Sequence, residues 1–200
     1  GGEAGERFAF EGVARAYGAE GAAALRRARV AVVGVGGVGS WAAEALARTG
    51  VGSITLVDLD EVCVSNVNRQ AYALTSTVGR PKVDVAAQRI ADINAECDVR
   101  CVHDFVSVEN VSELLAPPLD CVVDCVDDFR VKAAIVAHCR RVGVRVVTTG
   151  GAAGADNAAA VRTDDLARAQ QNPLLAKTRK ELRARYRFPA ARGGGKTPKK

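Results

Sequence analysis

The sequence predicts an α/β fold, a Rossmann-like doubly wound and mostly parallel sheet with helices on both faces. Between residues 29 and 149, short runs rich in valine and isoleucine alternate with helical patterns. Such alternation is typical of parallel sheets built from β-α-β units. The clearest unit spans residues 29–60, where an apolar run, a glycine-rich turn, a helical pattern and a second apolar run follow one another.

In this unit the first strand is expected at 30–33 and the second at 53–57, because both runs are short, apolar and rich in β-branched residues. Residues 40–48 between them are good helix formers. Gly50 then stands where helices commonly end.

The turn after the first strand holds four glycines, which are Gly34, Gly36, Gly37 and Gly39. Glycines let the backbone turn tightly and let backbone amides approach a phosphate. Asp58 comes 19 residues after Gly39, close to the spacing at which a carboxylate meets a ribose hydroxyl. We therefore predict a nucleotide site. The alternative is a glycine-rich turn that only packs the helix on the strand.

The rest of the chain continues the alternation. Residues 7–29 favour short amphipathic helices before the first strand. Further helices are predicted at 81–94, 108–115 and 130–141, and further strands at 99–102, 119–126 and 144–149. Ligands of such sheets bind outside the carboxyl ends of the strands. One edge should therefore gather the segments 34–39 and 150–154 with Asp58 and Asp127.

Basic residues are concentrated at the C-terminal end. Residues 1–161 hold 16 Lys/Arg against 20 Asp/Glu, whereas residues 162–200 hold 12 against 3. Helices are expected at 164–166 and, strongly basic, at 173–187, and residues 192–200 favour disorder.

The six cysteines form no CxxC pair, which indicates small buried thiols in a reducing compartment rather than a zinc site. No apolar run approaches the ~20 residues of a membrane span. We expect no membrane association and a cytoplasmic location, or an organelle if the source is eukaryotic.

Four features go beyond a plain dinucleotide fold. The turn has the form GxGGxGS, the acid is doubled in DLD at 58–60, Asn66 follows in NVNRQ, and Asp127 lies in DCVDD. This combination resembles the adenylating domain of the ubiquitin-activating-enzyme superfamily (ThiF/MoeB-type), which includes the bacterial activators of sulfur carriers. The resemblance implies that the chain binds ATP and Mg²⁺ and adenylates a carboxylate.

The same resemblance implies roles for single residues. Gly37 would let ATP approach closely, Asp58 would bind the ribose, and Asn66 and Arg69 would contact phosphates. Lys82 would hold the phosphate being transferred, and Asp127 would bind Mg²⁺. The implied nucleotide-binding set is Gly34, Gly36, Gly37, Gly39, Asp58, Asn66, Arg69, Lys82 and Asp128, and the implied catalytic set is Arg69, as an arginine finger, Lys82 and Asp127.

These residue types suit the chemistry, since a carboxylate that attacks an α-phosphate builds negative charge that Arg, Lys and Mg²⁺ stabilise. Taken singly, each has a plain alternative. Arg69 would be a surface residue, Lys82 a solvated residue at a helix start, and Asp127 the cap of the next helix. Their joint spacing argues against all three alternatives at once.

Longer stretches resemble the bacterial tRNA threonylcarbamoyladenosine dehydratase family within this superfamily. They are RFAFEGVARAYG, GSWAAEALARTGVGSITLVDLDEVCVSNVNRQ, TTGGAAG and DLARAQQNPLLAKTR. The resemblance implies ATP-dependent dehydration, a cyclisation, of threonylcarbamoyladenosine at tRNA position 37 through an adenylated carboxylate. It also implies a homodimer, and it makes a sulfur-transfer or cysteine desulfurase system a further candidate partner.

On this basis we divide the chain into an ATP-binding adenylating domain at 7–154, a helical basic extension at 155–188 and a disordered basic tail at 189–200. Two departures from the family matter. Its chain continues past the basic helix, whereas this one ends at Lys200, which leaves reduced activity or a fragment open. The superfamily's N-terminal arginine is replaced by Phe10, so that Arg7 and Arg15 are the candidates.

Three alternative functions stay open. An activator of the C-terminus of a ubiquitin-like or sulfur-carrier protein would normally carry CxxC zinc pairs and often a transfer cysteine. Cys63 is the nearest candidate for that cysteine, but its position after a strand indicates packing. A nicotinamide dehydrogenase would leave Asn66, Arg69 and Lys82 without a role. The third alternative is a truncated, inactive nucleotide-binding homologue.

Overall fold

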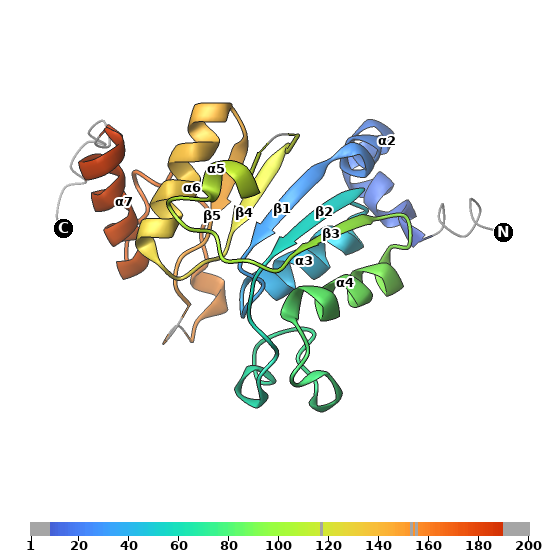
Figure 1. Ribbon diagram of the computed structural model, residues 1–200. Coiled ribbons are helices and arrows are strands. Elements are labelled where there is room, and N and C mark those ends of the chain that lie inside the picture. Colours follow the sequence, from blue (N-terminus) through green and yellow to red (C-terminus); the bar gives the residue numbers. More distant parts are fainter. Residues whose placement is uncertain (1–8, 117, 153, 155, 190–200) are drawn as a thin grey trace.

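The computed structural model describes residues 9–116, 118–152, 154 and 156–189. Its centre is a parallel five-stranded sheet in the order β3-β2-β1-β4-β5 (Figure 1). The strands are β1 (Arg29–Val33), β2 (Ser53–Val57), β3 (Asp98–Val102), β4 (Cys121–Asp124) and β5 (Arg145–Thr148). From β1 the chain builds outward to β3 and then returns to add β4 on the other side of β1. The predicted doubly wound fold is confirmed.

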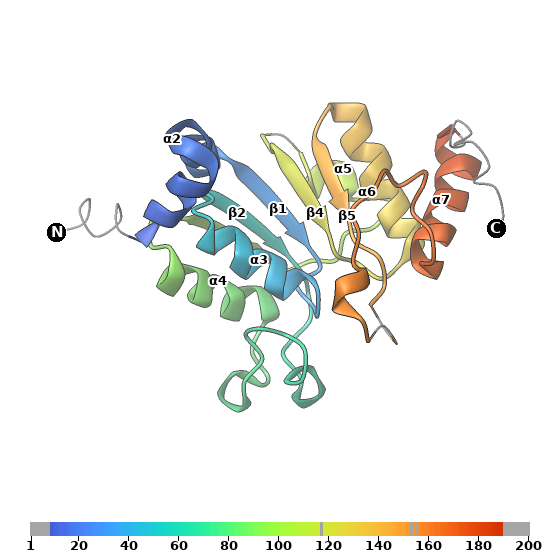
Figure 2. The ribbon, with the colours of Figure 1, turned by 180° about the vertical axis from the view of Figure 1, so that it is seen from behind.

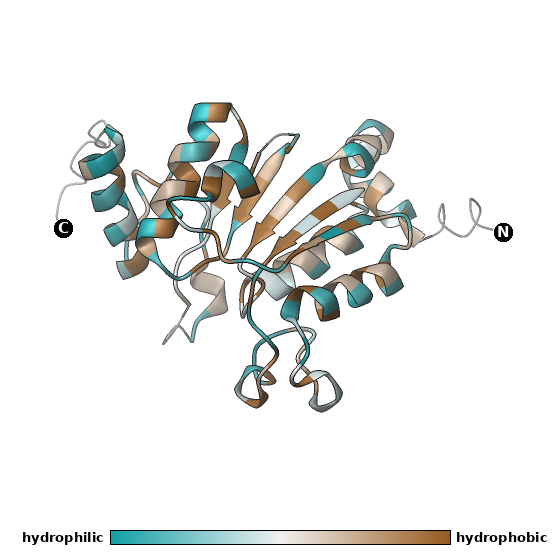
Figure 3. Cartoon of the chain, in the orientation of Figure 1, coloured by the Kyte–Doolittle hydropathy of each residue, from teal (hydrophilic) through white to brown (hydrophobic). Residues whose placement is uncertain are grey.

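Helices cover both faces of the sheet, as Figures 1 and 2 show from opposite sides. On one face, α3 (Gly39–Arg48) and α4 (Lys82–Ile93) pack on β1 and β2 around buried residues such as Val32, Leu56 and Ile90. On the other face, α5 (Val111–Leu114) and α6 (Phe129–Val142) pack on Ala31 and Val122. Because the central strands β1, β2 and β4 are covered on both faces, they are largely apolar (Figure 3), whereas the edge strands β3 and β5 carry exposed charged residues such as Arg100 and Arg145.

Two helices lie outside these layers. The N-terminal α2 (Glu11–Arg27) is interrupted by a kink at Gly18, whose φ of 75° favours glycine, so the predicted short helices before β1 are found. The C-terminal α7 (Pro173–Tyr186) packs on α6 through Leu182 and Tyr186. Most of its remaining surface is hydrophilic (Figure 3).

Several predicted boundaries differ from the structure. The helix expected at 108–115 is the short α5, and the strand expected at 119–126 ends at Asp124, where the Asp124 carboxylate accepts from the Val126 amide at 3.2 Å and turns the chain. No helix forms at 164–166, so that prediction is wrong. The Asp165 side chain accepts from the Ala167 amide at 2.8 Å, and this bond favours a turn over a helix. The 3-10 helix η3 (Ala158–Ala160) lies in the segment before it.

Between β2 and α4 the chain makes an excursion, residues 59–81, that contains the 3-10 helices η1 (Val64–Asn66) and η2 (Thr75–Thr77). It projects beyond the sheet (Figure 1, teal to green). Its two ends are joined, because the Val62 amide donates to Arg80 O at 2.9 Å and the Gly79 amide donates to Val62 O at 2.8 Å. This neck returns the chain to the vicinity of Asp60, so that α4 begins beside it at Lys82.

A buried ion pair stabilises the junction of β4, β5 and α6. Lys132 Nζ lies 3.1 Å from Asp124 Oδ1, and both side chains are fully buried. The hydroxyl of Thr148 donates to Asp124 Oδ2 at 2.6 Å. Removing one member of such a pair leaves an uncompensated buried charge.

Lys132→Met should therefore lower the free energy of unfolding by about 3–5 kcal/mol, measured by denaturant titration. The control is Arg29→Met, which breaks the half-exposed pair with Asp120 and should cost much less, because solvent screens an exposed pair. Equal losses of unfolding free energy in the two variants would show that the buried pair stabilises the fold no more than the half-exposed pair does.

Candidate nucleotide site

The glycine turn lies between β1 and α3, beside the point where the strand order reverses. Gly34 has a φ of 79°, and a Cβ there would lie 3.2 Å from the Cys125 backbone. A Cβ at Gly39 would collide with the carbonyl oxygen of Gly34. These two glycines are required by packing alone. At Gly36 an added Cβ would not clash, because Gln70 Nε2 would lie 3.9 Å from it.

Asp58 is clamped against this turn by two backbone donors. The Val35 amide donates to Asp58 Oδ2 at 2.9 Å, and the Asp60 amide donates to Oδ1 at 2.9 Å. The residue is only 7% exposed. A carboxylate has about four acceptor positions, so the clamp fixes its orientation and leaves capacity for a ribose hydroxyl.

Lys82 is brought to the same edge by the neck of the excursion. Its amide donates to Asp60 O at 2.9 Å, and its Nζ pairs with Asp60 Oδ2 at 2.6 Å. The Lys82 side chain is 8% exposed, so the alternative of a solvated helix-start residue is wrong. An ammonium group has three donors, and the pair with Asp60 holds it beside the clamped Asp58.

Arg69 lies against the glycine turn. A Cβ added at Gly37 would be 3.3 Å from Arg69 Cδ, so glycine is what lets the arginine stem approach this closely. Arg69 Nη1 donates to Ser65 O at 2.8 Å and to Asn68 Oδ1 at 3.0 Å. The buried Asn66 holds the base of this segment, because its Oδ1 accepts from the Cys63 amide at 2.9 Å.

The two acids after β4 have different surroundings. Asp128 caps α6, its Oδ1 accepting from the Arg130 amide at 2.6 Å and the Val131 amide at 3.2 Å. The alternative that Asp127 caps this helix is therefore wrong, and one oxygen of Asp128 is committed to the helix. Asp127 itself is exposed at the strand end.

The donor set at this edge fits Mg²⁺ brought by a nucleotide. Mg²⁺ typically takes one or two protein carboxylates together with substrate phosphates, and the exposed Asp127 supplies one. Within the described part of the chain, no group of three or more His, Cys, Asp or Glu could hold a metal by itself. The assignment of Asp127 to Mg²⁺ stays a prediction.

Two buried residues that the sequence analysis missed support the turn. The hydroxyl of Tyr72 donates to the carbonyl oxygen of Val35 and lies 3.2 Å from Gln70 Oε1. Burial, with the nearby charges of Asp58 and Asp60, raises the pKa of Tyr72 far above its usual value. The phenol therefore stays neutral and keeps its proton for Val35.

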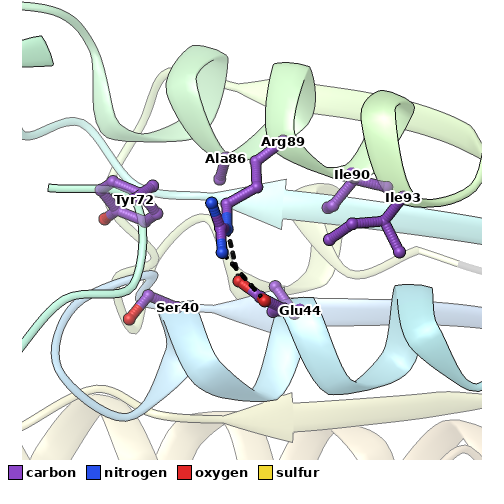
Figure 4. Close-up of a pocket in the computed structure, with 8 residues that line it drawn as sticks. Ser40, Glu44, Tyr72, Ala86, Arg89, Ile90 and Ile93 are labelled. Atoms are coloured by element: carbon purple, nitrogen blue, oxygen red, sulfur yellow. Dashed lines mark hydrogen bonds and ion pairs between the residues drawn. The ribbon is translucent and has the colours of Figure 1, made fainter. Parts of the chain in front are cut away.

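The small hollow between α3 and α4 in Figure 4 is a packing feature of the two helices that support the candidate site, and it is not part of that site. Its volume of about 10 Å³ is too small for more than a water molecule. Across it, Arg89 Nη2 donates to Glu44 Oε1 at 3.0 Å. Hydrogen bonding from Arg89 lowers the pKa of Glu44, so the ion pair joins the two helices at neutral pH.

The expectation of buried thiols holds in part, because Cys139 is buried, Cys97, Cys101, Cys121 and Cys125 are partly buried, and Cys63 is exposed. Burial raises the pKa of Cys97, Cys125 and Cys139 to about 11, so these thiols are protonated at neutral pH and poor nucleophiles. Cys63, in contrast, is exposed, and the expectation that it packs is wrong.

The sequence of this chain is similar to those of proteins in one known family. The sequence model of the ThiF family matches residues 11–181. This chain belongs to the ThiF family. Family members named tRNA threonylcarbamoyladenosine dehydratase are 48% identical over 90% of this chain in Escherichia coli and 44% identical over 90% in Haemophilus influenzae. The chain spans 67% and 69% of those two relatives.

Solved structures of the E. coli tRNA threonylcarbamoyladenosine dehydratase have the same fold as this chain. The crystal structure described as its complex with ATP superposes with a TM-score of 0.88 at 48% identity, over 90% of this chain and 74% of that one. The complex with AMP gives 0.87. The molybdopterin-synthase adenylyltransferase of Salmonella typhimurium, another relative, is 37% identical over 71% of this chain and 57% of its own.

The glycine turn generates a matched prediction. Gly39→Ala should destabilise the fold by about 3 kcal/mol or more, because the methyl group meets backbone that cannot move aside, whereas Gly36→Ala should cost less than about 1 kcal/mol. Thermal unfolding of the two variants measures the difference. Equal melting temperatures would show that the turn is not packed as described.

Proposed function

We propose that this chain catalyses the ATP-dependent dehydration, a cyclisation, of threonylcarbamoyladenosine at position 37 of tRNA through an adenylated carboxylate. The observation that carries the proposal is the 48% identity, over 90% of the chain, to an enzyme named for this reaction. The clustering of Asp58, Lys82 and Arg69 at the glycine turn supports it, because each supplies a group that an adenylation site needs.

The chemistry has two stages. A carboxylate oxygen of the threonylcarbamoyl group attacks the α-phosphorus of ATP, the bond to the β-phosphate bridging oxygen breaks, and pyrophosphate leaves. An internal nucleophile of the same modified nucleoside then attacks the activated acyl carbon, and AMP leaves as the ring closes. The net loss of one water molecule is thus coupled to conversion of ATP to AMP and pyrophosphate.

The residues divide this work. Asp58, oriented by Val35 and Asp60, accepts from the ribose. Arg69 and Lys82 stabilise negative charge on the phosphates, Lys82 exchanging its Asp60 partner for phosphate oxygen. Asp127 would hold Mg²⁺, which supplies charge neutralisation on the phosphates when bound. Asn66 remains a candidate for a phosphate contact through its side-chain amide, and Asp128 remains a candidate for nucleotide binding through the carboxylate oxygen that does not cap α6.

A second candidate function is adenylation of the C-terminus of a ubiquitin-like or sulfur-carrier protein. The similarity to molybdopterin-synthase adenylyltransferase favours it. The exposed Cys63 is available as the transfer cysteine of such an enzyme. The dehydratase relatives, however, are more similar over more of the chain. We therefore favour the reaction on tRNA.

The basic extension is the proposed contact for tRNA phosphates. In α7, Thr178 and Leu182 are buried. Lys180 and Arg183 are exposed in the same helix, and Arg187 is exposed just after it. Arg185 is partly engaged by Glu181 at 3.0 Å. Such contacts set affinity rather than base specificity.

We further propose that the protein works as a homodimer in the cytoplasm. Exposed apolar side chains on the excursion, such as Leu59, Val64 and Leu74, are of the type found in dimer interfaces. Of the candidate N-terminal arginines, Arg15 pairs with Glu11 at 2.7 Å, and Arg7 lies outside the described residues. No helix in the described ranges is long and apolar enough to span a membrane. A sulfur-transfer partner stays a prediction.

The experiment that tests the proposed function is mass spectrometry of nucleosides. Incubation of the protein with ATP, Mg²⁺ and threonylcarbamoylated tRNA should convert the modified nucleoside to a product lighter by one water. Omission of ATP is the control. Unchanged nucleoside, together with pyrophosphate release on addition of a carrier protein, would favour the second candidate.

Asp127→Asn should abolish most turnover while leaving thermal stability unchanged, because Asp127 is exposed and caps nothing. The matched control is Asp128→Asn, which keeps a capping side chain and should retain turnover better. Full activity of the Asp127 variant, measured as pyrophosphate release, would remove this residue from the site.

Arg69→Ala should lower kcat by a factor on the order of 10³, by analogy with other arginine fingers, with little change in ATP affinity. Steady-state kinetics and ATP titration separate the two effects. Loss of ATP affinity with unchanged kcat would make Arg69 a binding residue instead.

Replacing Lys180, Arg183 and Arg187 together by Gln should weaken tRNA binding and flatten the slope of log K against log salt by about 2 to 3 units, with ATP binding unchanged. The charge-matched control replaces three other exposed arginines, which are Arg26, Arg27 and Arg100. Identical salt slopes for the two variants would show that α7 is only a solvated face.

A further inference from the structure

The first turn of α3 holds the segment that carries Arg69. Trp41 Nε1 donates to the carbonyl oxygen of Arg69 at 2.9 Å. One residue earlier, Ser40 Oγ accepts from the Ala71 amide at 3.1 Å. Two adjacent residues of one helix therefore bind the backbone on both sides of Gln70.

Trp41 is the single tryptophan of the chain and is 56% exposed. Much of its ring is in solvent, so burial of apolar area accounts for only part of what Trp41 contributes to stability. Its indole N–H is a donor with no acceptor capacity. Trp41 donates this one hydrogen bond to the backbone of Arg69, the residue whose guanidinium the proposed chemistry requires.

Arg69 is thereby held at three places. Trp41 binds its carbonyl oxygen, Gly37 leaves room for its aliphatic stem, and Ser65 O with Asn68 Oδ1 accept from Nη1. The backbone bond is the one that comes from α3. A helix that follows a glycine turn presents its N-terminus to phosphates, so α3 would hold both the nucleotide and, through Trp41, the arginine.

We propose that Trp41 is a positioning residue that fixes Arg69 relative to the phosphate-binding turn. This inference rests on the proposed function for its catalytic consequence and on the hydrogen bond for its structural one. A misplacement of about 1 Å in a reacting group can cost about 10²-fold in rate, which makes one hydrogen bond between an exposed indole and a loop carbonyl consequential for turnover.

The test is Trp41→Phe, which removes the N–H and keeps an aromatic ring at a largely exposed position. Hydrogen exchange of the Arg69, Gln70 and Ala71 amides should accelerate several-fold, an outcome that does not depend on the reaction. The control Phe105→Leu alters another half-exposed aromatic side chain and should leave this exchange unchanged. Unaltered exchange in the Trp41 variant would overturn the inference.

Kinetics then test the link to Arg69. In the otherwise normal chain, Trp41→Phe should lower kcat by about 10-fold to 10²-fold with the KM for ATP within about twofold. In an Arg69→Ala background it should lower kcat no further, because a positioning residue acts through its target. The same loss in both backgrounds, or a normal kcat where Arg69→Ala is crippled, would overturn the inference. A normal kcat of Arg69→Ala itself would instead refute the proposed role of Arg69.

Discussion

The hydrogen bond from the Val35 amide to the Asp58 carboxylate is the interaction on which the candidate site depends. It joins the turn after β1 to the end of β2, and the second oxygen of Asp58 carries the connection to Asp60. Asp60 in turn pairs with Lys82 at the start of α4. A short chain of polar contacts thus connects the glycine turn to Lys82, the cation that we propose for the phosphates.

This chain of contacts explains why the excursion leaves the sheet and returns at the same place. Its neck, joined between Val62 and Arg80, sets Lys82 beside Asp60, while its middle lays Arg69 on the glycine turn. Parallel strands gather their carboxyl ends at one edge, so Asp127, which follows β4, lies at the same edge. The sheet therefore supplies the edge, the excursion supplies Arg69, and the start of α4 supplies Lys82.

Much of this could be predicted from the sequence, because strands such as 53–57 and the glycine turn are local patterns with known geometry. The edge shared by Asp58 and Asp127 followed from the parallel topology. The Trp41–Arg69 bond and the Lys132–Asp124 pair could not be predicted, since they join segments whose approach no periodicity encodes. The failure at 164–166 has a local cause, an aspartate that competes for the backbone amides.

We infer that this edge binds ATP rather than a nicotinamide dinucleotide. Isothermal titration calorimetry of the protein with ATP and Mg²⁺, and separately with NAD, distinguishes the two ligands. We predict saturable ATP binding and no comparable heat with NAD. ATP binding should be lost in Asp58→Ala, because this variant lacks the carboxylate that the Val35 and Asp60 amides orient. Tight NAD binding with no ATP binding would show that the edge is a dinucleotide site instead.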